Sequence, residues 1–371
     1  MPMKWGLALA GGGTRGSYHI GAWRALRELG KEIEAVTGTS IGAVNGAFIV
    51  SDAYDEAVGL WNSIEMKDIV KLSEEMTEEK NLFDVKNVMA IATELHNNKG
   101  LDVSPFEKIL KDNIDEKTVR KSDMDYGLVT FNLSDKKRIQ LFKKDIPRGK
   151  LCEYIMASAA FPVFKPKKIG KSVFVDGGVW NNMPVDMLIE RDCDNIVAID
   201  VGGIGIVQSA NISGRNIVGI RPVESVVGIM DFDAEAISKN IEQGYYDTMK
   251  AFGVYSGEYY YFSDYSASKL MYSSEILVGL EKAGKILGIE RFCPYTVNEF
   301  IRNVLSLYNA QDKEYKKELM KFTNEKYIMC CISHAIVSGD NDWLNNKFIS
   351  GLSGGVFEGA RAVSYFAKTF V

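Results

Sequence analysis

Few histidines, few cysteines and no long apolar run set the first limits on this 371-residue sequence. Its five cysteines are too few for a disulfide scaffold and odd in number, so we interpret them as reduced thiols of a cytoplasmic protein. A membrane span needs about 20 predominantly apolar residues, but the longest uncharged stretch, Ala35–Ser51, is rich in Gly, Thr, Ser and Asn. The apolar residues 5–10 run directly into glycines, which does not suit a secretory signal. We expect no membrane span, and peripheral contact with a membrane stays open.

The sequence also lacks a strong charge and a recognisable set of metal ligands. Its formal charge is −5, from 44 Lys and Arg against 49 Asp and Glu, which argues against a nucleic-acid binder that relies on bulk charge. Cys330, Cys331 and His334 do not have the spacing of a zinc site and are more typical of a buried helix. The tyrosine-rich run at 258–262 has no basic cluster beside it, so it predicts a strand rather than a surface for stacking bases. We therefore predict no metal and no nucleic-acid partner.

Short apolar runs alternate with helical patterns over most of the chain. Trp5–Ala10 and Ile196–Ile199 are almost continuously apolar, as parallel strands are when helices cover both faces of their sheet. Tyr126–Leu133 and Arg138–Phe142 flank a turn-like tetrapeptide and predict a hairpin. This alternation predicts an α/β fold with a mainly parallel sheet.

The strand signals fade from about Ser273 onward. Apolar residues between 297 and 308 follow the i, i+3, i+4, i+7 spacing of an amphipathic helix. No Pro-rich or Ser-rich linker separates this part from the rest. We predict an α/β domain over residues 1–269 and an appended helical region over residues 270–371 that packs on it.

A glycine-rich loop, residues 11–16, follows the first predicted strand and precedes a predicted helix at about Ser17–Leu29. Backbone N–H groups in such a loop can point at an anion, and the helix N-terminus adds partial positive charge. The loop also matches the loose Gly-x-Gly-x-x-Gly spacing of dinucleotide-binding proteins. However, Glu32 and Glu34, the candidates for a ribose contact, come before the second predicted strand rather than at its end.

A second loop has the pattern of a nucleophile elbow. The short strand Ala35–Thr37 is followed by Gly38-Thr39-Ser40-Ile41-Gly42, and residues 43–48 then open a helix. Gly-x-Ser-x-Gly between a strand and a helix exposes the serine hydroxyl above the sheet, with glycines where the tight turn passes close to other backbone. A turn with a capping serine and no catalytic role could have the same sequence. The glycine-rich loop that precedes it in the chain favours Ser40 as a nucleophile instead.

A serine nucleophile needs a base. His19 falls in the first predicted helix, His96 at an exposed helix end and His334 in the helical region, so none has the setting of a catalytic histidine. Asp176 follows the predicted strand 172–175 and enters a Gly-Gly turn, so its carboxylate would emerge at the carboxyl end of a strand, where α/β folds bind ligands. Taken alone, Asp176 is better explained by an aspartate that caps a turn, as is common before Gly-Gly.

Together and in this order, these elements resemble the patatin-like phospholipase family. The resemblance spans residues 4–250 and includes the segments 157–164 and 179–185 around the Asp-Gly-Gly motif. It implies a patatin-like α/β hydrolase domain, a three-layer sandwich with a mainly parallel central sheet. It also implies acyl hydrolysis by Ser40 and Asp176 without histidine, metal or cofactor. The residues that resemble the oxyanion loop of the family and the glycines of its two turns are Gly11, Gly12, Gly13, Thr14, Arg15, Gly16, Gly38, Gly42, Gly177 and Gly178.

The function implied by the resemblance is hydrolysis of ester bonds in phospholipids or lysophospholipids. Ser40 would attack the carbonyl carbon, Asp176 would accept its proton, and N–H groups of the glycine loop would stabilise the oxyanion. Arg15 would stabilise the loop or contact a substrate phosphate, and a salt bridge at the start of the helix would explain it equally well. An unperturbed aspartate is a weak base at neutral pH. Burial would raise its pKa and a hydrogen bond from Ser40 would lower it, and the sequence leaves the balance open.

Other interpretations stay open on the sequence alone. The loop at 11–16 could serve an oxidoreductase with a nucleotide cofactor, which would leave Ser40 and Asp176 without a role. A non-catalytic binding protein could retain the same fold. The apolar and methionine-rich stretch Trp61–Leu95 predicts either amphipathic helices packed on the core or a mobile cap that meets lipid. The sequence does not indicate an oligomeric state.

Overall fold

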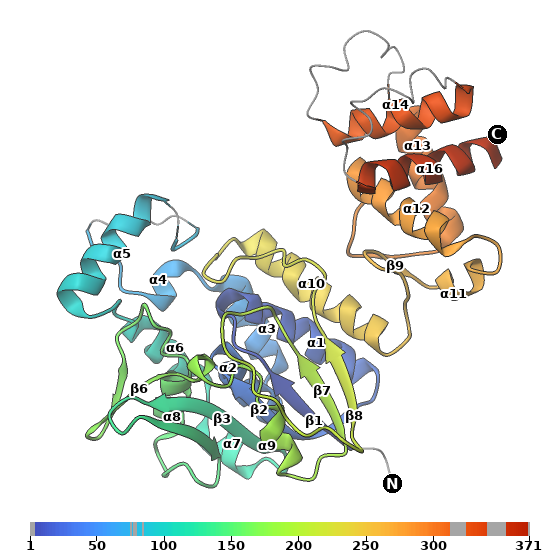
Figure 1. Cartoon of the computed structure of the whole chain (residues 1–371). Helices are drawn as coiled ribbons and strands as arrows, with labels where there is room; N and C mark the ends of the chain where they lie inside the picture. Colours follow the sequence, from blue (N-terminus) through green and yellow to red (C-terminus); the bar gives the residue numbers. More distant parts are fainter. Residues whose placement is uncertain are drawn as a thin grey trace. The chain divides into compact units, whose positions relative to one another are not determined.

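The apolar runs near residues 5 and 196 form neighbouring parallel strands inside one sheet, with a further strand on each side of the pair (Figure 1). The structure, a computed structural model, describes residues 4–74, 76, 80–83, 85–311, 324–339 and 354–369. It divides into two units, Met1–Ala251 and Phe252–Val371. All five cysteines are free thiols. No described helix is both long enough and apolar enough to cross a membrane.

The first unit contains the sheet. Its strands are β1 (Lys4–Leu9), β2 (Glu32–Thr39), β3 (Asp125–Asn132), β4 (Lys137–Phe142), β5 (Lys167–Ile169), β6 (Ser172–Asp176), β7 (Asn195–Ile199) and β8 (Asn216–Ile220). Its helices are η1 (Gly13–Gly16), α1 (Ser17–Glu28), α2 (Ile41–Val50), α3 (Tyr54–Ser63), α4 (Met66–Ile69), α5 (Val85–Asn98), α6 (Ser104–Asn113), α7 (Glu116–Lys121), α8 (Leu151–Ser158), η2 (Gly177–Val179), α9 (Val185–Ile189) and α10 (Ala234–Ala251).

The sheet has the strand order β5-β6-β3-β2-β1-β7-β8, and β4 pairs with β3 beside this path. Strands β3, β2, β1, β7 and β8 are neighbours in that order, and each pairs in parallel with the next. Strands β4 and β6 run antiparallel to β3, and β5 runs antiparallel to β6. The prediction of an α/β fold with a mainly parallel sheet is confirmed, and so is the hairpin of β3 and β4.

Helices cover both faces of the sheet. On β3, the buried Tyr126 donates its hydroxyl to the carbonyl oxygen of Ala43 in α2. The next residue, Gly127, faces the side chain of Met187 in α9. Successive residues of a strand point to opposite faces, so α2 and α9 lie on opposite sides of the sheet. The first unit is therefore a helix–sheet–helix sandwich of three layers.

The strand directions bring distant segments to one edge of the sheet. The glycine-rich loop follows β1, Ser40 follows β2, and residues 200–215 join β7 to β8. Because β1, β2 and β7 are parallel, these segments leave the sheet at the same edge. Strand β6 runs the other way, and its last residue, Asp176, pairs with Thr130 near the carboxyl end of β3. Asp176 therefore reaches the edge that Ser40 occupies.

The second unit is built from helices around its own core. Its elements are β9 (Tyr261–Phe262), α11 (Tyr265–Ser268), α12 (Ser274–Leu287), β10 (Pro294–Tyr295), α13 (Val297–Asn309), α14 (Glu325–Ser338) and α16 (Gly354–Thr369). The amphipathic helix predicted over 297–308 is confirmed by α13, and Cys330 and Cys331 are buried in α14. The division between units falls before the boundary expected at residue 270, because Tyr260 and Phe262 belong to this second core. That the helical region packs on the α/β domain stays a prediction.

A buried carboxylate organises the second unit. Glu281 of α12 is only 2% exposed, and its oxygens accept hydrogen bonds from the backbone N–H groups of Glu258, Tyr259 and Tyr260 at 2.7–3.0 Å. The tyrosine-rich run is thereby held against α12, and the ring of Tyr260 packs on Phe300 with the ring centroids 4.5 Å apart. One side chain thus supplies the acceptors for three backbone donors.

We expect Glu281→Ala to lower the free energy of unfolding by about 3 kcal/mol or more, because three N–H groups lose their acceptor. Urea denaturation followed by circular dichroism measures this change. Glu275→Ala is the matched control, since Glu275 is exposed in the first turn of the same helix, and its effect should stay within about 0.5 kcal/mol. Equal losses in the two variants would contradict the role given to Glu281.

Candidate active site

Ser40 sits in a strained turn between β2 and α2. Its backbone angles are φ 57° and ψ −125°, and residues other than glycine rarely adopt positive φ. The N–H of Ser40 donates to Oγ of Ser158 at 2.9 Å. A Cβ at Gly38 would overlap the carbonyl group of Gly42, and one at Gly42 would overlap that of Leu9. The close approach of backbone thus explains both glycines around the serine.

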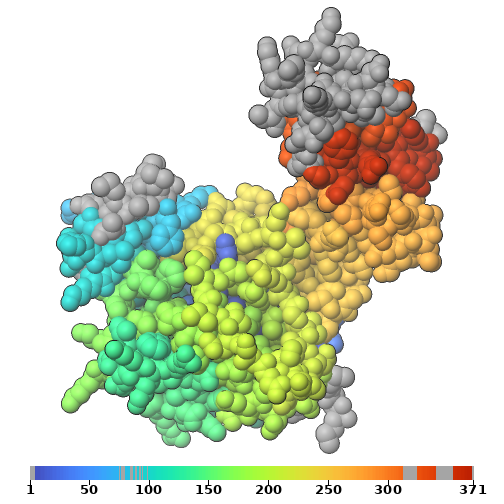
Figure 2. Space-filling view, viewed as in Figure 1, coloured from blue at the N-terminus to red at the C-terminus, as the bar shows by residue number. Residues whose placement is uncertain are grey.

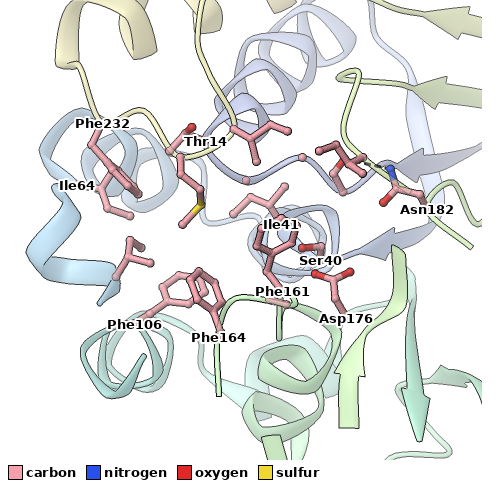
Figure 3. Close-up of a pocket in the computed structure, with 18 of the residues that line it drawn as sticks. Thr14, Ser40, Ile41, Ile64, Phe106, Phe161, Phe164, Asp176, Asn182 and Phe232 are labelled. Atoms are coloured by element: carbon pink, nitrogen blue, oxygen red, sulfur yellow. Dashed lines mark hydrogen bonds between the residues drawn. The ribbon is translucent and has the colours of Figure 1, made fainter. Parts of the chain in front are cut away.

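Asp176 both caps a turn and faces Ser40. Its side chain is buried, and Oδ1 accepts a hydrogen bond from the N–H of Gly178 at 2.7 Å. The side chains of Ser40 and Asp176 point toward each other in the pocket (Figure 3). A Cβ at Gly177 would overlap the carbonyl group of Val129, so the turn can follow the strand this closely only with glycine. The two interpretations of Asp176 from the sequence are therefore compatible.

The environment of Asp176 suits a group that takes up a proton near neutrality. Burial raises the pKa of Asp176 to about 6, although the Ser40 hydroxyl and the Gly178 N–H work in the opposite direction. The second carboxyl oxygen, Oδ2, is buried and has no hydrogen-bond partner within the part of the chain that the structure describes. Burial therefore outweighs hydrogen bonding, and one oxygen is left to accept a proton.

The glycine-rich loop presents two backbone donors that have no acceptor. The N–H of Gly11 already donates to the carbonyl oxygen of Asn182 at 3.3 Å. Within the described part of the chain, the N–H groups of Gly12 and Gly13 donate to no backbone or side-chain acceptor. Gly13 has φ 58°, which an L-residue would adopt only under strain. Of the three glycines predicted to bind an oxyanion, Gly12 and Gly13 therefore offer free donors and Gly11 does not.

Thr14, Arg15 and Gly16 support this loop. Arg15 donates from Nη1 to the carbonyl oxygen of Gly202 at 2.5 Å and from Nε to that of Val227 at 3.2 Å. The Thr14 hydroxyl donates to the carbonyl oxygen of the residue after Val227. A Cβ at Gly16 would crowd the first side chain of α2. The contacts of Arg15 favour the loop-stabilising role over the phosphate contact.

An apolar pocket opens beside Ser40 (Figure 3). Its walls come from the glycine loop, from α3, α4 and α6, and from the segments 159–164 and 229–232. Asp176 is the sole ionisable residue that lines it in the described part of the chain. The large apolar side chains in the walls include Trp61, Ile64, Phe106, Phe161, Phe164 and Phe232. Such a pocket suits a hydrocarbon chain and offers no cation to a phosphate.

Part of the stretch Trp61–Leu95 belongs to the pocket walls. Trp61 is buried and donates from its indole N–H to Oδ1 of Asn45 in α2 at 3.1 Å. Phe83 and Leu95 are exposed. The side chains of Val85, Val88 and Met89 lie outside the described residues. The beginning of the stretch therefore packs on the core, and a cap that meets lipid stays a prediction for the remainder.

The three histidines do not line the pocket. His19 is fully buried in α1, and burial lowers its pKa to about 3, so this imidazole is neutral near pH 7. His96 is exposed near the end of α5, and His334 belongs to the second unit. Asp176 is consequently the ionisable group that faces Ser40 in this pocket.

Asn182 is a pocket residue that the sequence did not single out. Its Nδ2 donates to the carbonyl oxygen of Gly11 at 3.2 Å (Figure 3), and its backbone N–H donates to that of Ile206 at 2.6 Å. Together with the bond from the N–H of Gly11, these contacts join the glycine-rich loop to the segment that follows Asp176. Asn182 lies in the segment 179–185, but a buried asparagine has no pattern that predicts a partner so far away in the chain.

The two acidic residues that were candidates for a contact with the ribose of a nucleotide lie far from the glycine-rich loop. Glu32 and Glu34 are at the amino end of β2, whereas the glycine-rich loop follows the carboxyl end of β1, the parallel neighbour of β2. They are thus at the opposite edge of the sheet from the loop. No described feature supports the oxidoreductase alternative.

Comparison with known proteins gives the family of this part of the chain. Residues 7–189 match the family model described as patatin-like phospholipase. These residues belong to the patatin-like phospholipase family. The match includes the glycine-rich loop, Ser40, Asp176 and Asn182, and it lies within the first unit, which we call the patatin-like unit.

Similar proteins include an uncharacterised NTE family protein of Mycobacterium tuberculosis, 27% identical over 198 residues, which are 53% of this chain and 49% of that protein. Neuropathy target esterase sws of Drosophila melanogaster is 27% identical over 53% of this chain and 13% of its own length. Lysophospholipase nte1 of Neurospora crassa is 30% identical over 54% of this chain and 12% of its own length. Among solved structures, VipD from Legionella pneumophila aligns with a TM-score of 0.46 at 15% identity, over 98% of this chain and 91% of that one. The matches thus span about half of the mycobacterial relative and much less of the other two relatives.

The carboxyl group of Asp176 should titrate near pH 6, because burial outweighs the hydrogen bonds that it accepts. Carbon-13 NMR of aspartate-labelled protein measures this, with Asp176→Asn to assign the signal. Ser40→Ala should raise the pKa further, since it removes a group that lowers it. A value near the unperturbed ~3.9 would contradict the buried environment described above.

Proposed function

We propose that this chain hydrolyses carboxylic ester bonds of phospholipids or lysophospholipids, with Ser40 as the nucleophile and Asp176 as the base. One observation carries the proposal. A serine at positive φ and a buried carboxyl group with a pKa of about 6 face each other in an apolar pocket. The family match and the lysophospholipase among the relatives support the class of substrate.

In the first step Oγ of Ser40 attacks the ester carbonyl carbon, and its proton passes to Oδ2 of Asp176. The carbonyl oxygen becomes an oxyanion, which the free N–H groups of Gly12 and Gly13 are placed to stabilise. Removal of one such donor typically lowers kcat by about 10²–10³. The tetrahedral intermediate collapses when the bond to the leaving alcohol breaks, and Asp176 returns the proton to that alcohol oxygen.

In the second step water attacks the acyl group on Ser40. Asp176 accepts the proton of the water, and the oxyanion is held by the same two N–H groups. When the bond to Oγ breaks, the proton passes from Asp176 to Ser40, and a fatty acid leaves. The pKa of Asp176 is consistent with both directions of transfer, because efficient acid–base catalysis needs a pKa near the working pH.

The pocket recognises the acyl part of the substrate in this proposal. Its described walls are apolar and aromatic, so a fatty acyl chain replaces water there. No described cation lines the pocket, and Arg15 is engaged by backbone carbonyl groups. The headgroup therefore lies outside the pocket. A cytoplasmic location, with peripheral contact to lipid, completes the proposal.

A non-catalytic binding protein would not need these features together. Backbone strain such as that of Ser40 costs of order 1–3 kcal/mol and persists where function requires it. A buried carboxyl group without a full set of hydrogen bonds is also unfavourable. Both occur at one point of the pocket, which favours catalysis over binding alone.

Ser40→Ala should abolish hydrolysis of short-chain nitrophenyl esters, and Asp176→Asn should lower kcat by about 10²–10⁴, the usual contribution of a general base. Initial rates with the full chain measure both effects. Ser51→Ala is the matched control, because Ser51 caps the far end of the same helix α2, and its rate should equal that of the unchanged protein. Retained hydrolysis in Ser40→Ala would refute the mechanism.

The pH dependence of kcat/KM should follow the ionisation of Asp176. The ionised form is the base, so kcat/KM should fall as the pH drops through about 6 and level off above it. Measurement with a soluble ester between about pH 4 and pH 8, roughly two units to either side of that pKa, would show the inflection. An inflection near pH 4, or none in this range, would count against Asp176 as the base.

A further inference from the structure

The loop that joins β7 to β8 exposes apolar side chains without any charge among them. Residues 201–214 contain no Asp, Glu, Lys or Arg. Ile204, Ile206, Val207 and Ile212 are 75, 54, 61 and 53% exposed. Residues near position 200, yellow-green in the space-filling view, lie on the surface of the patatin-like unit (Figure 2). Single apolar residues are ordinary on a surface, whereas four in one uncharged loop are a candidate interaction site.

Hydrogen bonds and close contacts hold the first half of this loop against other backbone segments, so the exposure of its side chains follows from a defined backbone conformation. Ile206 donates its N–H to the carbonyl oxygen of Gly178 at 2.9 Å and accepts a hydrogen bond from the N–H of Asn182 at 2.6 Å. A Cβ at Gly203 would overlap the carbonyl group of Gly11. The loop therefore rests on both the glycine-rich loop and the turn after Asp176.

The exposed loop is continuous with the pocket. Ile204 lines the pocket that contains Ser40 and Asp176, and it is also the most exposed of the four apolar residues. An acyl chain that enters beside Ile204 would pass from this loop to pocket walls in which Asp176 is the sole ionisable residue in the described part of the chain. The loop also carries uncharged polar side chains, among them the exposed Ser209, Asn211 and Ser213. A surface of apolar and uncharged polar groups can enter the interfacial region of a lipid layer without burying a charge.

We propose that residues 201–214 are the lipid-docking loop of this protein. The side chains of Val207, Ile212 and their apolar neighbours insert into the surface of a membrane or micelle, and this places the pocket entrance at the lipid. The proposal rests on the proposed function for the identity of the substrate. It adds the surface through which that substrate is reached.

The absence of charge determines how such docking responds to salt and headgroup. Electrostatic attraction to anionic lipid is screened within about 8–10 Å at ordinary ionic strength, whereas insertion of apolar side chains is not. Binding through this loop should therefore occur on zwitterionic phosphatidylcholine vesicles and persist in 0.5 M NaCl, which is roughly three times the physiological ionic strength.

The test uses the full chain with Ser40→Ala, so that vesicles stay intact and binding does not depend on turnover. Val207→Ser with Ile212→Ser should lower partition into phosphatidylcholine vesicles, measured by co-sedimentation, by about tenfold or more. Leu270→Ser with Met271→Ser is the matched control, because these residues of the second unit are 90 and 69% exposed, and it should leave partition unchanged. Val207→Trp should increase partition, since indole favours the membrane interface.

Several results would overturn the proposal. The first is that the Val207→Ser, Ile212→Ser variant partitions into vesicles as well as its parent. The second is that the Leu270→Ser, Met271→Ser control loses as much partition as that variant. The others are loss of vesicle binding in 0.5 M NaCl and no increase in partition with Val207→Trp. A shift in oligomeric mass with unchanged vesicle binding would assign the loop to contacts between copies instead. Hydrolysis of a monomeric nitrophenyl ester by the protein with Ser40 intact tests the proposed function separately, because that ester needs no lipid surface.

Discussion

Close approach of backbone segments at the carboxyl edge of the sheet is the constraint on which the rest of the structure depends. Gly42 lies against the carbonyl group of Leu9, Gly38 against that of Gly42, and Gly203 against that of Gly11. At each of these places a Cβ would overlap a neighbouring main chain. The elbow, the glycine-rich loop and the β7–β8 loop are therefore fixed relative to one another by sterics. A turn supported in this way can keep Ser40 at an unfavourable φ.

The exclusion of water from the pocket beside Ser40 has two effects. The apolar walls that suit a hydrocarbon chain also remove water from Asp176, and this raises the pKa of its carboxyl group toward neutrality. A more polar pocket would lower that pKa and would bind an acyl chain less well. In the proposed function, the affinity of the pocket for an acyl chain and the basicity of Asp176 are thus coupled through one physical property, the exclusion of water. In the proposed mechanism this coupling takes the place of a histidine, and the His19 imidazole is instead buried and neutral.

The two units have separate structural determinants. Every residue that lines the pocket in the described part of the chain precedes residue 252. The second unit has its own aromatic and aliphatic core and its own buried carboxylate, Glu281, which accepts three backbone hydrogen bonds. Residues 7–189 match the family model, and this match lies within the first unit.

The sequence by itself determined several strands, the hairpin, the helix α13 and the pattern Gly38 to Gly42, because these depend on neighbours in the chain, whereas the short strand β5 and the edge strand β8 were not predicted. Periodicity and tight turns leave local signatures, so they could be predicted. Only the tertiary structure decided which of the glycine N–H groups are free, that Asn182 contacts Gly11, and that Phe106 and Phe232 share a wall with Ser40. It also decided whether burial or hydrogen bonding controls the pKa of Asp176. These properties arise between segments far apart in the chain, where distance, overlap and exclusion of water depend on how the whole sheet and its loops come together.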